Sequence, residues 1–285
     1  MTQGSTGTAV IYLSYVPYGT FPLSDFIRSY NTYDAGTPHS LIILFKGMKG
    51  EVELTPFFEL LKESGKDFSF LCYYGGGFDI HAYSWAAGQL QTECLFFLNT
   101  RSVLLAGNWL HHYMCNFSGP TGIISATASQ QSYYSSVFQK NKFTWEHSKG
   151  FLINFRKVKL FLKAFFYWRF LFSAFPNPHV RTNAFLVRRK DFLQIRIKTG
   201  RSKFKAYLTE SGRKSITAYF MARGLDVLVV DRFGKTYDRR NWASSATFWI
   251  REQENLLIAD NQTMLYERAT AEEKSTMTKL AWGEL

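Results

Sequence analysis

The chain has 285 residues, enough for one large α/β domain or two small ones, and its hydrophobic content of 46% is ample for a buried core. The three cysteines, Cys72, Cys94 and Cys115, are widely spaced and show neither a disulfide framework nor a metal-binding pattern, so we expect a protein of the reducing cytosol. The first eight residues are polar and lack the features of a signal peptide, and we expect no transmembrane span.

The positive charge is concentrated in the middle of the chain. The formal net charge is +12, yet residues 140–214 contain 19 Lys and Arg against three acidic residues, a net charge of +16. The rest of the chain therefore carries a net charge of −4. A basic middle in an otherwise slightly acidic protein indicates an anionic partner for that part.

Apolar strands and helices alternate in the first hundred residues. The pattern predicts strands over residues 9–15, 40–45 and 68–74 and a fourth that begins at Cys94, separated by helices over 24–33, 54–64 and 80–91. This order favours a parallel, doubly wound sheet. Ligands on such sheets bind outside the carboxyl ends of the strands, so the residues that follow the strands are the first candidates for a binding site.

Two polar segments follow strands at this edge. Gly75-Gly-Gly77 leads to Asp79 at the start of a helix, where glycines allow close approach of a ligand and the helix N-terminus offers N–H groups to a phosphate. Asn99-Thr100-Arg101 follows the strand that begins at Cys94. The alternative interpretation of the first segment is an ordinary glycine turn with Asp79 as a helix N-cap.

The stretch over residues 151–175, FLINFRKVKLFLKAFFYWRFLFSAF, combines large aromatic residues with basic ones. On a helix, Arg156, Lys159 and Lys163 fall within about 60° of one another, and most aromatic and aliphatic residues cover the rest. We predict that residues 148–176 form an amphipathic helical insertion in the membrane interface, with its basic residues on anionic phosphates. The alternative is a buried helix or helix pair whose lysines reach the surface.

The chain beyond residue 108 is predicted to extend the sheet. Its pattern indicates strands over residues 122–127, 184–187 and 225–230, helices over 109–117 and 215–223, and a polar loop over 129–136 near the ligand face. Glu210 stands in a Ser/Gly turn of the basic region, and we expect it to act as a general base. Two alternatives remain open: Glu210 pairs with an arginine, and Asp260 only forms a turn.

These segments resemble a known family. The strand over residues 9–15, Gly77-Phe-Asp79, the run over 94–102, and Asn183-Ala-Phe-Leu-Val-Arg188-Arg189 followed by a Glu-Ser-Gly turn look like a bacterial glycosyltransferase with the GT-A fold. The chain is similar to glycosyltransferase family 2 and its relatives in surface polysaccharide synthesis, over most of its length. The resemblance implies a GT-A-like (Rossmann-like), mostly parallel sheet flanked by helices.

The resemblance also implies roles for individual residues. The nucleotide-sugar site would be formed by Ser14, Tyr15, Pro17, Gly77, Asp79, Asn99, Thr100 and Arg101. The acceptor side would be formed by His179, Arg181, Asn183, Trp242 and Asp260, with Glu210 as the catalytic base. The family carries an Asp-x-Asp metal motif where this sequence has Asn99-Thr-Arg101. This departure puts a requirement for Mg²⁺ or Mn²⁺ into question, because the Arg101 guanidinium can neutralise a diphosphate directly.

We therefore expect a single GT-A-like domain over residues 1–285. It would consist of a nucleotide-sugar-binding half at 1–135, the membrane-associating insertion at 148–176, and an acceptor and catalytic half with a C-terminal tail at 177–285. The expected activity is that of a hexosyltransferase, with inversion, from a nucleoside-diphosphate sugar to a hydroxyl of a glycan or lipid-linked acceptor in cell-surface polysaccharide synthesis. The protein would be cytoplasmic and peripheral on the inner face of the cell membrane.

Two other classes of function are weighed against this one. The first is a non-catalytic glycosyltransferase-like protein that binds a glycan or acts as a scaffold at the membrane, which the missing Asp-x-Asp would fit. The second is nucleic-acid binding through the basic, aromatic middle, because aromatic stacking and basic side chains also suit single strands. We rank the second last and expect no nucleic-acid partner, since apolar residues around a basic helical stripe suit lipid better.

Overall fold

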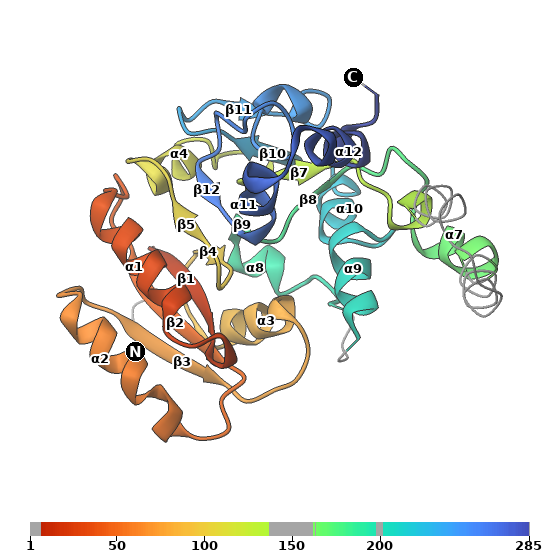
Figure 1. Cartoon of the computed structure of the whole chain (residues 1–285). Helices are drawn as coiled ribbons and strands as arrows, with labels where there is room; N and C mark the ends of the chain where they lie inside the picture. The colour runs from red at the N-terminus through yellow and green to blue at the C-terminus, as the bar shows by residue number, and fades with distance from the viewer. Residues whose placement is uncertain (1–6, 137–161, 163, 198–201, 285) are drawn as a thin grey trace.

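The computed structural model describes residues 7–136, 162, 164–197 and 202–284, and its centre is an eight-stranded sheet with helices on both faces (Figure 1). The strand order is β11-β10-β6-β9-β4-β1-β2-β3. β1, β2, β3 and β4 are mutually parallel, and β6 is parallel to β10. The predicted α/β class, with a mostly parallel sheet flanked by helices, is confirmed.

The alternation predicted for the first hundred residues is also confirmed. The elements in chain order are β1 (Thr8–Tyr15), α1 (Phe21–Thr32), β2 (Ser40–Lys46), α2 (Thr55–Glu63), β3 (Ser69–Tyr73), α3 (Asp79–Gln89) and β4 (Cys94–Leu98). Each boundary lies within a few residues of the one that the pattern of apolar residues predicts. β1 lies between β4 and β2, so the carboxyl ends of β1, β2 and β4 meet at one edge of the sheet.

Alternate residues of the central strands form the two cores that hold the sheet between its helices. Ile11 and Leu13 of β1 pack in one core with side chains of α3 such as Tyr83, whereas Val10 and Tyr12 pack in the other with α1 and α2. All of these β1 residues are buried, because both faces of the sheet are covered. This burial on both sides explains why the strand reads as a continuous apolar run.

The chain beyond β4 adds short strands and helices around this sheet. In chain order these are β5 (Val103–Leu104), α4 (Trp109–Met114), β6 (Thr121–Ser125), β7 (Ala128–Ser129), α7 (Arg169–Leu171), β8 (His179–Val180), β9 (Ala184–Arg188), α8 (Arg189–Phe192), α9 (Lys203–Ser211), α10 (Ile216–Met221), β10 (Asp226–Val230), β11 (Thr236–Tyr237), β12 (Ile258–Ala259), α11 (Asn261–Arg268) and α12 (Ala271–Trp282). Two small antiparallel sheets, β12-β5 and β7-β8, join distant segments.

The strand β9 runs antiparallel to both of its neighbours, β4 and β6. Its first residue, Ala184, pairs with Leu98, the last residue of β4. The segment that enters β9 therefore lies at the same edge as the carboxyl ends of β1, β2 and β4. This reversal brings residues 179–183 to Asn99, and the backbone N–H of Asn99 donates to the carbonyl of Asn183 at 2.9 Å.

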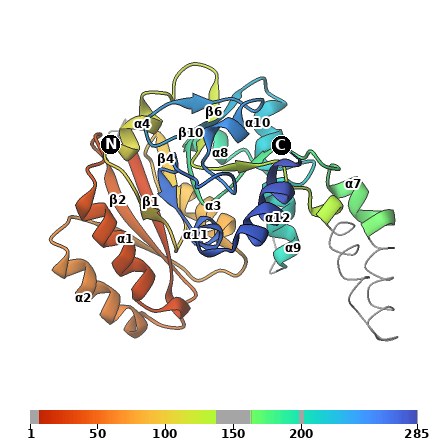
Figure 2. The same cartoon turned by 45° about the horizontal axis from the view of Figure 1, so that its top comes forward.

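In the middle of the chain, one expectation is wrong and another falls largely outside the described residues. Glu210 does not stand in a Ser/Gly turn: it lies in the last turn of α9, because Phe204, Tyr207 and Leu208 pack this segment as a helix against Tyr133 and Phe172. The insertion predicted over residues 148–176 lies outside the described residues except for 162 and 164–176. In that described part, a π-helical turn (Ala164–Trp168) leads into α7, which stands at the margin of the molecule (Figure 2).

Replacement of Phe97 should test the core beneath the ligand edge. Phe97 is fully buried in β4, and its ring contacts Tyr83, Phe185 and Phe192. Phe97→Ala should lower the free energy of unfolding by about 3–5 kcal/mol, measured by chemical denaturation. Phe21→Ala, at an exposed position of α1, is the control and should change it by about 0.5 kcal/mol or less. Equal effects of the two variants would contradict the described packing.

Candidate active site

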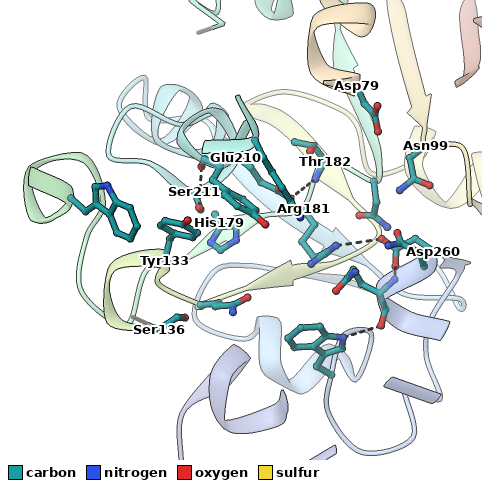
Figure 3. A pocket seen from close by; sticks show the side chains of 18 residues that line it. Asp79, Asn99, Tyr133, Ser136, His179, Arg181, Thr182, Glu210, Ser211 and Asp260 are labelled. Carbon is teal, nitrogen blue, oxygen red and sulfur yellow. Dashed lines mark hydrogen bonds and ion pairs between the residues drawn. The ribbon is translucent and has the colours of Figure 1, made fainter. Parts of the chain in front are cut away.

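Two adjoining hollows open at the edge of the sheet where β1, β2 and β4 end and β9 begins. The larger has a volume of about 680 Å³ and the smaller about 370 Å³. They share four lining residues, Asp79, Asn99, Lys203 and Asn261. Figure 3 shows Asp79 and Asn99 at one end of the larger hollow, with Tyr133 and Ser136 toward the other. The two hollows therefore form one continuous site across the sheet edge.

The smaller hollow is lined by residues at the ends of three parallel strands. Tyr15 ends β1, Lys46 ends β2, and Asn99, Thr100 and Arg101 follow β4. Gly77 and Asp79 complete the set, so this hollow unites six of the eight residues predicted for a nucleotide-sugar site. Gly77 has φ +97°, and a Cβ there would lie 2.8 Å from Nδ1 of His81, so the turn requires glycine.

Cations and aromatic rings share the smaller hollow. The Lys46 ammonium lies 3.1 Å from Oδ1 of Asp79 and 5.6 Å from the ring centre of Tyr15. The Arg101 guanidinium stands 5.1 Å from the ring centre of Tyr18, which itself packs edge-to-face with Tyr15. Asp79 is the first residue of α3, where a carboxylate is favourable to the helix dipole, but it does not act as the N-cap.

The segment Asn99-Thr100-Arg101 has a fixed conformation. Oδ1 of Asn99 accepts hydrogen bonds from the backbone N–H of Arg101 and from the Ser102 hydroxyl. The Thr100 hydroxyl accepts from the backbone N–H of Tyr15, which ties β4 to β1 at this edge. The side-chain oxygen of Asn99 is thus already engaged in holding the turn, while the Arg101 side chain is exposed to solvent.

Glu210 and His179 lie in the larger hollow. Oε1 of Glu210 accepts a hydrogen bond from the backbone N–H of Thr182 at 3.0 Å, which fixes the carboxylate from α9 against the segment that enters β9 (Figure 3). Nδ1 of His179 lies 2.8 Å from the carbonyl of Asn177. A carbonyl only accepts, so Nδ1 carries the hydrogen, and Nε2 of the neutral ring is the unprotonated nitrogen.

Asp260 has both a capping role and a contact within the larger hollow. Its Oδ1 accepts from the backbone N–H groups of Gln262 and Thr263, so Asp260 is the N-cap of α11. Its Oδ2 also lies 3.4 Å from the Arg181 guanidinium, so the residue takes part in the site as well. Nε of Arg181 and Nδ2 of Asn183 are buried and have no hydrogen-bond partner within the described chain.

Three of the predicted site residues do not line either hollow. Ser14 is buried in β1, Pro17 is exposed beyond its end, and Trp242 is buried in the core that contains α3 and α10. The other predicted residues line the smaller hollow, the larger hollow or both: Tyr15, Gly77, Asp79, Asn99, Thr100, Arg101, His179, Arg181, Asn183, Glu210 and Asp260.

Sequence reasoning missed several lining residues. In the larger hollow these are four aromatic residues, Tyr133, Trp168, Tyr207 and Trp249, and both hollows contain Lys203. The polar loop over residues 129–136 was expected near the ligand face, and it supplies Gln131, Tyr133 and Ser136. A signal for Lys46 was also present, because it ends an apolar strand as Tyr15 does, and the two are register partners.

The residues at this edge do not fit a divalent metal of the kind that an Asp-x-Asp motif holds. Asn99 offers a carboxamide oxygen that already accepts two hydrogen bonds, and Arg101 brings a cation to the second position of the motif. Within the part of the chain that the structure describes, no three His, Cys, Asp or Glu side chains are grouped to bind a metal ion.

No protein-family model matches the sequence, and no curated protein matches it. Similar solved structures include TarS residues 1–349 from S. aureus in complex with UDP-GlcNAc (10% identity, 42% of this chain and 33% of that chain, TM-score 0.31). They also include a mannosyltransferase from Pyrobaculum calidifontis in complex with GDP-Man and Mn²⁺ (13% identity, 44% of this chain and 37% of that chain, TM-score 0.31).

A third similar structure is 4-diphosphocytidyl-2C-methyl-D-erythritol synthase from Anaerococcus prevotii, at 11% identity over 79% of this chain and 86% of that chain, with a TM-score of 0.42. The chain spans about a third of the length of the TarS and mannosyltransferase chains. The expected arrangement of a mostly parallel sheet flanked by helices is present.

The environment of His179 predicts how stability changes with pH. Burial lowers the pKa of His179 below its usual 6.5, against the opposing effects of the nearby Glu210 carboxylate and the Asn177 carbonyl, while Arg181 adds to the lowering. The unfolded chain therefore binds a proton that the folded chain does not as the pH falls from 6.5 toward the lowered pKa, and the fold loses stability in that window.

His179→Asn should retain a donor near the Asn177 carbonyl but remove this titration. Thermal unfolding of both proteins is measured just above and well below pH 6.5. Between these two conditions, the melting temperature of the variant should fall less than that of the natural protein. An identical fall in both proteins would show that His179 does not titrate in the way described.

Proposed function

We propose that the protein is a glycosyltransferase that moves a sugar from a nucleoside-diphosphate donor to a hydroxyl of an acceptor. The observation that carries the proposal is the continuity of two chemically different hollows. The smaller one combines aromatic rings with Lys46 and Arg101, and the larger one combines aromatic rings with Glu210 and His179. The shared residues Asp79 and Asn99 would then stand where the donor sugar meets the acceptor.

The smaller hollow suits a nucleoside diphosphate. Tyr15 and Tyr18 offer ring faces and edges for a base, and Lys46 and Arg101 offer charge and hydrogen-bond donors to phosphate oxygens. Ligands of doubly wound sheets bind at such strand ends, which supports this placement. The donor would enter with its base toward β1 and its sugar toward the larger hollow.

The larger hollow suits a sugar acceptor. Stacked or tilted aromatic rings such as Tyr133 and Tyr207 present apolar faces, and Arg181, Asn183 and Gln131 present hydrogen-bonding groups. The unpartnered Nε of Arg181 and Nδ2 of Asn183 support a polar ligand here, because buried donors are normally satisfied.

Glu210 is the proposed catalytic base. One of its oxygens is held by the Thr182 N–H, and the other makes no hydrogen bond to any described residue. In the proposed reaction, this oxygen takes the proton of the acceptor hydroxyl as the hydroxyl oxygen bonds to the anomeric carbon. The bond from that carbon to the diphosphate oxygen breaks in the same displacement, so the configuration is inverted and a nucleoside diphosphate leaves.

Replacement of Glu210 tests this assignment. Glu210→Gln should bind the nucleotide as the natural protein does but lower the rate of transfer about 10²–10⁴-fold, because the amide cannot accept the proton. The assay would measure release of nucleoside diphosphate from UDP-, GDP- and dTDP-sugars in the presence of simple glycoside acceptors. Glu63→Gln, at an exposed position of α2, is the matched control and should leave turnover unchanged.

The outcomes separate the proposal from its main rival. Unchanged turnover in Glu210→Gln would refute the role of this residue. Nucleotide binding by the natural protein with no turnover on any donor and acceptor would instead favour the non-catalytic glycosyltransferase-like protein.

We further propose that the enzyme acts in surface polysaccharide synthesis and that the aromatic segment around α7 contacts the inner face of the cell membrane. Phe166, Tyr167 and Phe170 are exposed, and the Arg169 guanidinium lies 4.7 Å from the ring centre of Phe170. Such a group of rings around a cation suits the headgroup region of an anionic bilayer. No helix in the described part of the chain is long and apolar enough to cross a membrane.

Vesicle sedimentation tests the membrane contact. The natural protein should sediment with phosphatidylcholine vesicles that contain phosphatidylglycerol, and Phe166→Ser and Phe170→Ser should each weaken this binding about tenfold or more, since each ring would leave the lipid. Phe233→Ser, at an exposed aromatic position between β10 and β11, is the control and should have no effect. Absence of vesicle binding by the natural protein would contradict the proposal.

A further inference from the structure

The end of β2 places a buried cation at the floor of the smaller hollow. The side chain of Lys46 is only 8% exposed, although it lines the hollow. A buried ammonium is costly unless it is paired. Among the described residues, Asp79 is the anion that pairs with it, at 3.1 Å. The position of Lys46 is fixed by the strand, because it lies in register between Tyr15 and Tyr73.

The two partners of this ion pair differ in exposure. The Asp79 side chain is 47% exposed, so it can turn toward solvent without losing hydration, whereas Lys46 cannot follow it. Whatever replaces Asp79 must therefore bring negative charge into the hollow. A diphosphate does so, with several acceptor oxygens for the three N–H donors of the ammonium.

Other cations surround the same hollow. Arg101 lies beyond the end of β4 and Lys203 at the start of α9, and both line it. Together with Lys46 they offer three positive charges, whereas Asp79 is the single carboxylate among the described residues that line this hollow. The residues at the Asp-x-Asp position do not fit a metal, and these side chains can supply the positive charge that a diphosphate needs as the leaving group of the transfer.

We propose that Lys46 is the cation that neutralises the donor diphosphate in place of a divalent metal, with Arg101 assisting, and that Asp79 is its counter-ion only in the absence of ligand. This inference rests on the proposed nucleotide-sugar site and deepens it: the donor binds without a metal, and binding exchanges one anion of Lys46 for another. Lys46 stabilises the negative charge that grows on the leaving diphosphate when the bond to the sugar breaks.

Calorimetric titration of the full chain with UDP, GDP and dTDP tests the inference. Each nucleotide is titrated once in EDTA and once with Mn²⁺ or Mg²⁺. One nucleotide should bind in EDTA, and added metal should change its Kd little. Lys46→Met should weaken that binding about 10- to 100-fold, as expected for loss of a charged hydrogen bond, while the corresponding nucleoside should bind equally to both proteins. Lys46→Arg, which keeps the charge, should lose less affinity for the nucleotide than Lys46→Met.

Asp79→Asn distinguishes the proposed exchange from other roles of the ion pair. Removal of the competing carboxylate should make nucleotide binding in EDTA tighter. An unchanged or weaker affinity would mean that Asp79 does not compete with the diphosphate for Lys46 and would overturn the proposal. Arg101→Met, at an exposed site that should not affect folding, should weaken diphosphate binding in the same direction as Lys46→Met.

Two further outcomes separate this inference from the proposed function. Binding that appears only with Mn²⁺ or Mg²⁺, or that is unaffected by Lys46→Met, would overturn the metal-free role of Lys46 and leave the nucleotide site standing. Absence of binding by the natural protein in every condition would contradict the nucleotide site, and the inference would fall with it.

Discussion

The antiparallel pairing of β9 with β4 is the constraint on which the site depends. In a sheet of only parallel strands, the segment that enters β9 would lie at the amino-terminal edge, far from the loops that follow β1, β2 and β4. The reversal places Ala184 beside Leu98 and allows the Asn99 N–H to donate to the Asn183 carbonyl. His179 and Arg181 thereby face the same hollow as Asp79 and Asn99.

The helix α9 completes the site through a second set of contacts. The Asn177 amide donates to the carbonyl of Ser211, and the Glu210 carboxylate accepts from the Thr182 N–H. The end of α9 is thus fixed on both sides of the segment that enters β9. This arrangement joins a basic strand-end pocket from the first half of the chain to a carboxylate and aromatic pocket from the second half.

Much of the fold could be predicted from the sequence because both faces of the sheet are buried. The apolar runs of β1, β2 and β4 stand out, and the polar residues after them mark the ligand edge, so Tyr15, Asn99 and Arg101 could be assigned to it. The direction of β9 could not be predicted, because a run of four apolar residues before Arg188 has the same pattern in either direction.

The site was harder to predict where tertiary packing, and not the local sequence, determines the structure around a residue. The Ser211-Gly212 pair suggested a turn around Glu210, yet the aromatic contacts of Tyr207 and Phe204 make the segment helical. Trp242 was assigned to the acceptor side by the family resemblance, but it lies in the core. The aromatic lining of the larger hollow comes from four separate segments, and no local pattern brings Tyr133, Tyr207 and Trp249 together.

The most direct measurement of how the site works is a crystal structure of the protein with an intact nucleotide sugar that binds in the absence of metal. We predict that the diphosphate oxygens lie about 3 Å from the Lys46 ammonium, in place of Asp79, and that the sugar points toward Glu210. A diphosphate bound elsewhere, or one that contacts a metal held by Asp79 while Lys46 stays away, would contradict the proposed role of this edge of the sheet.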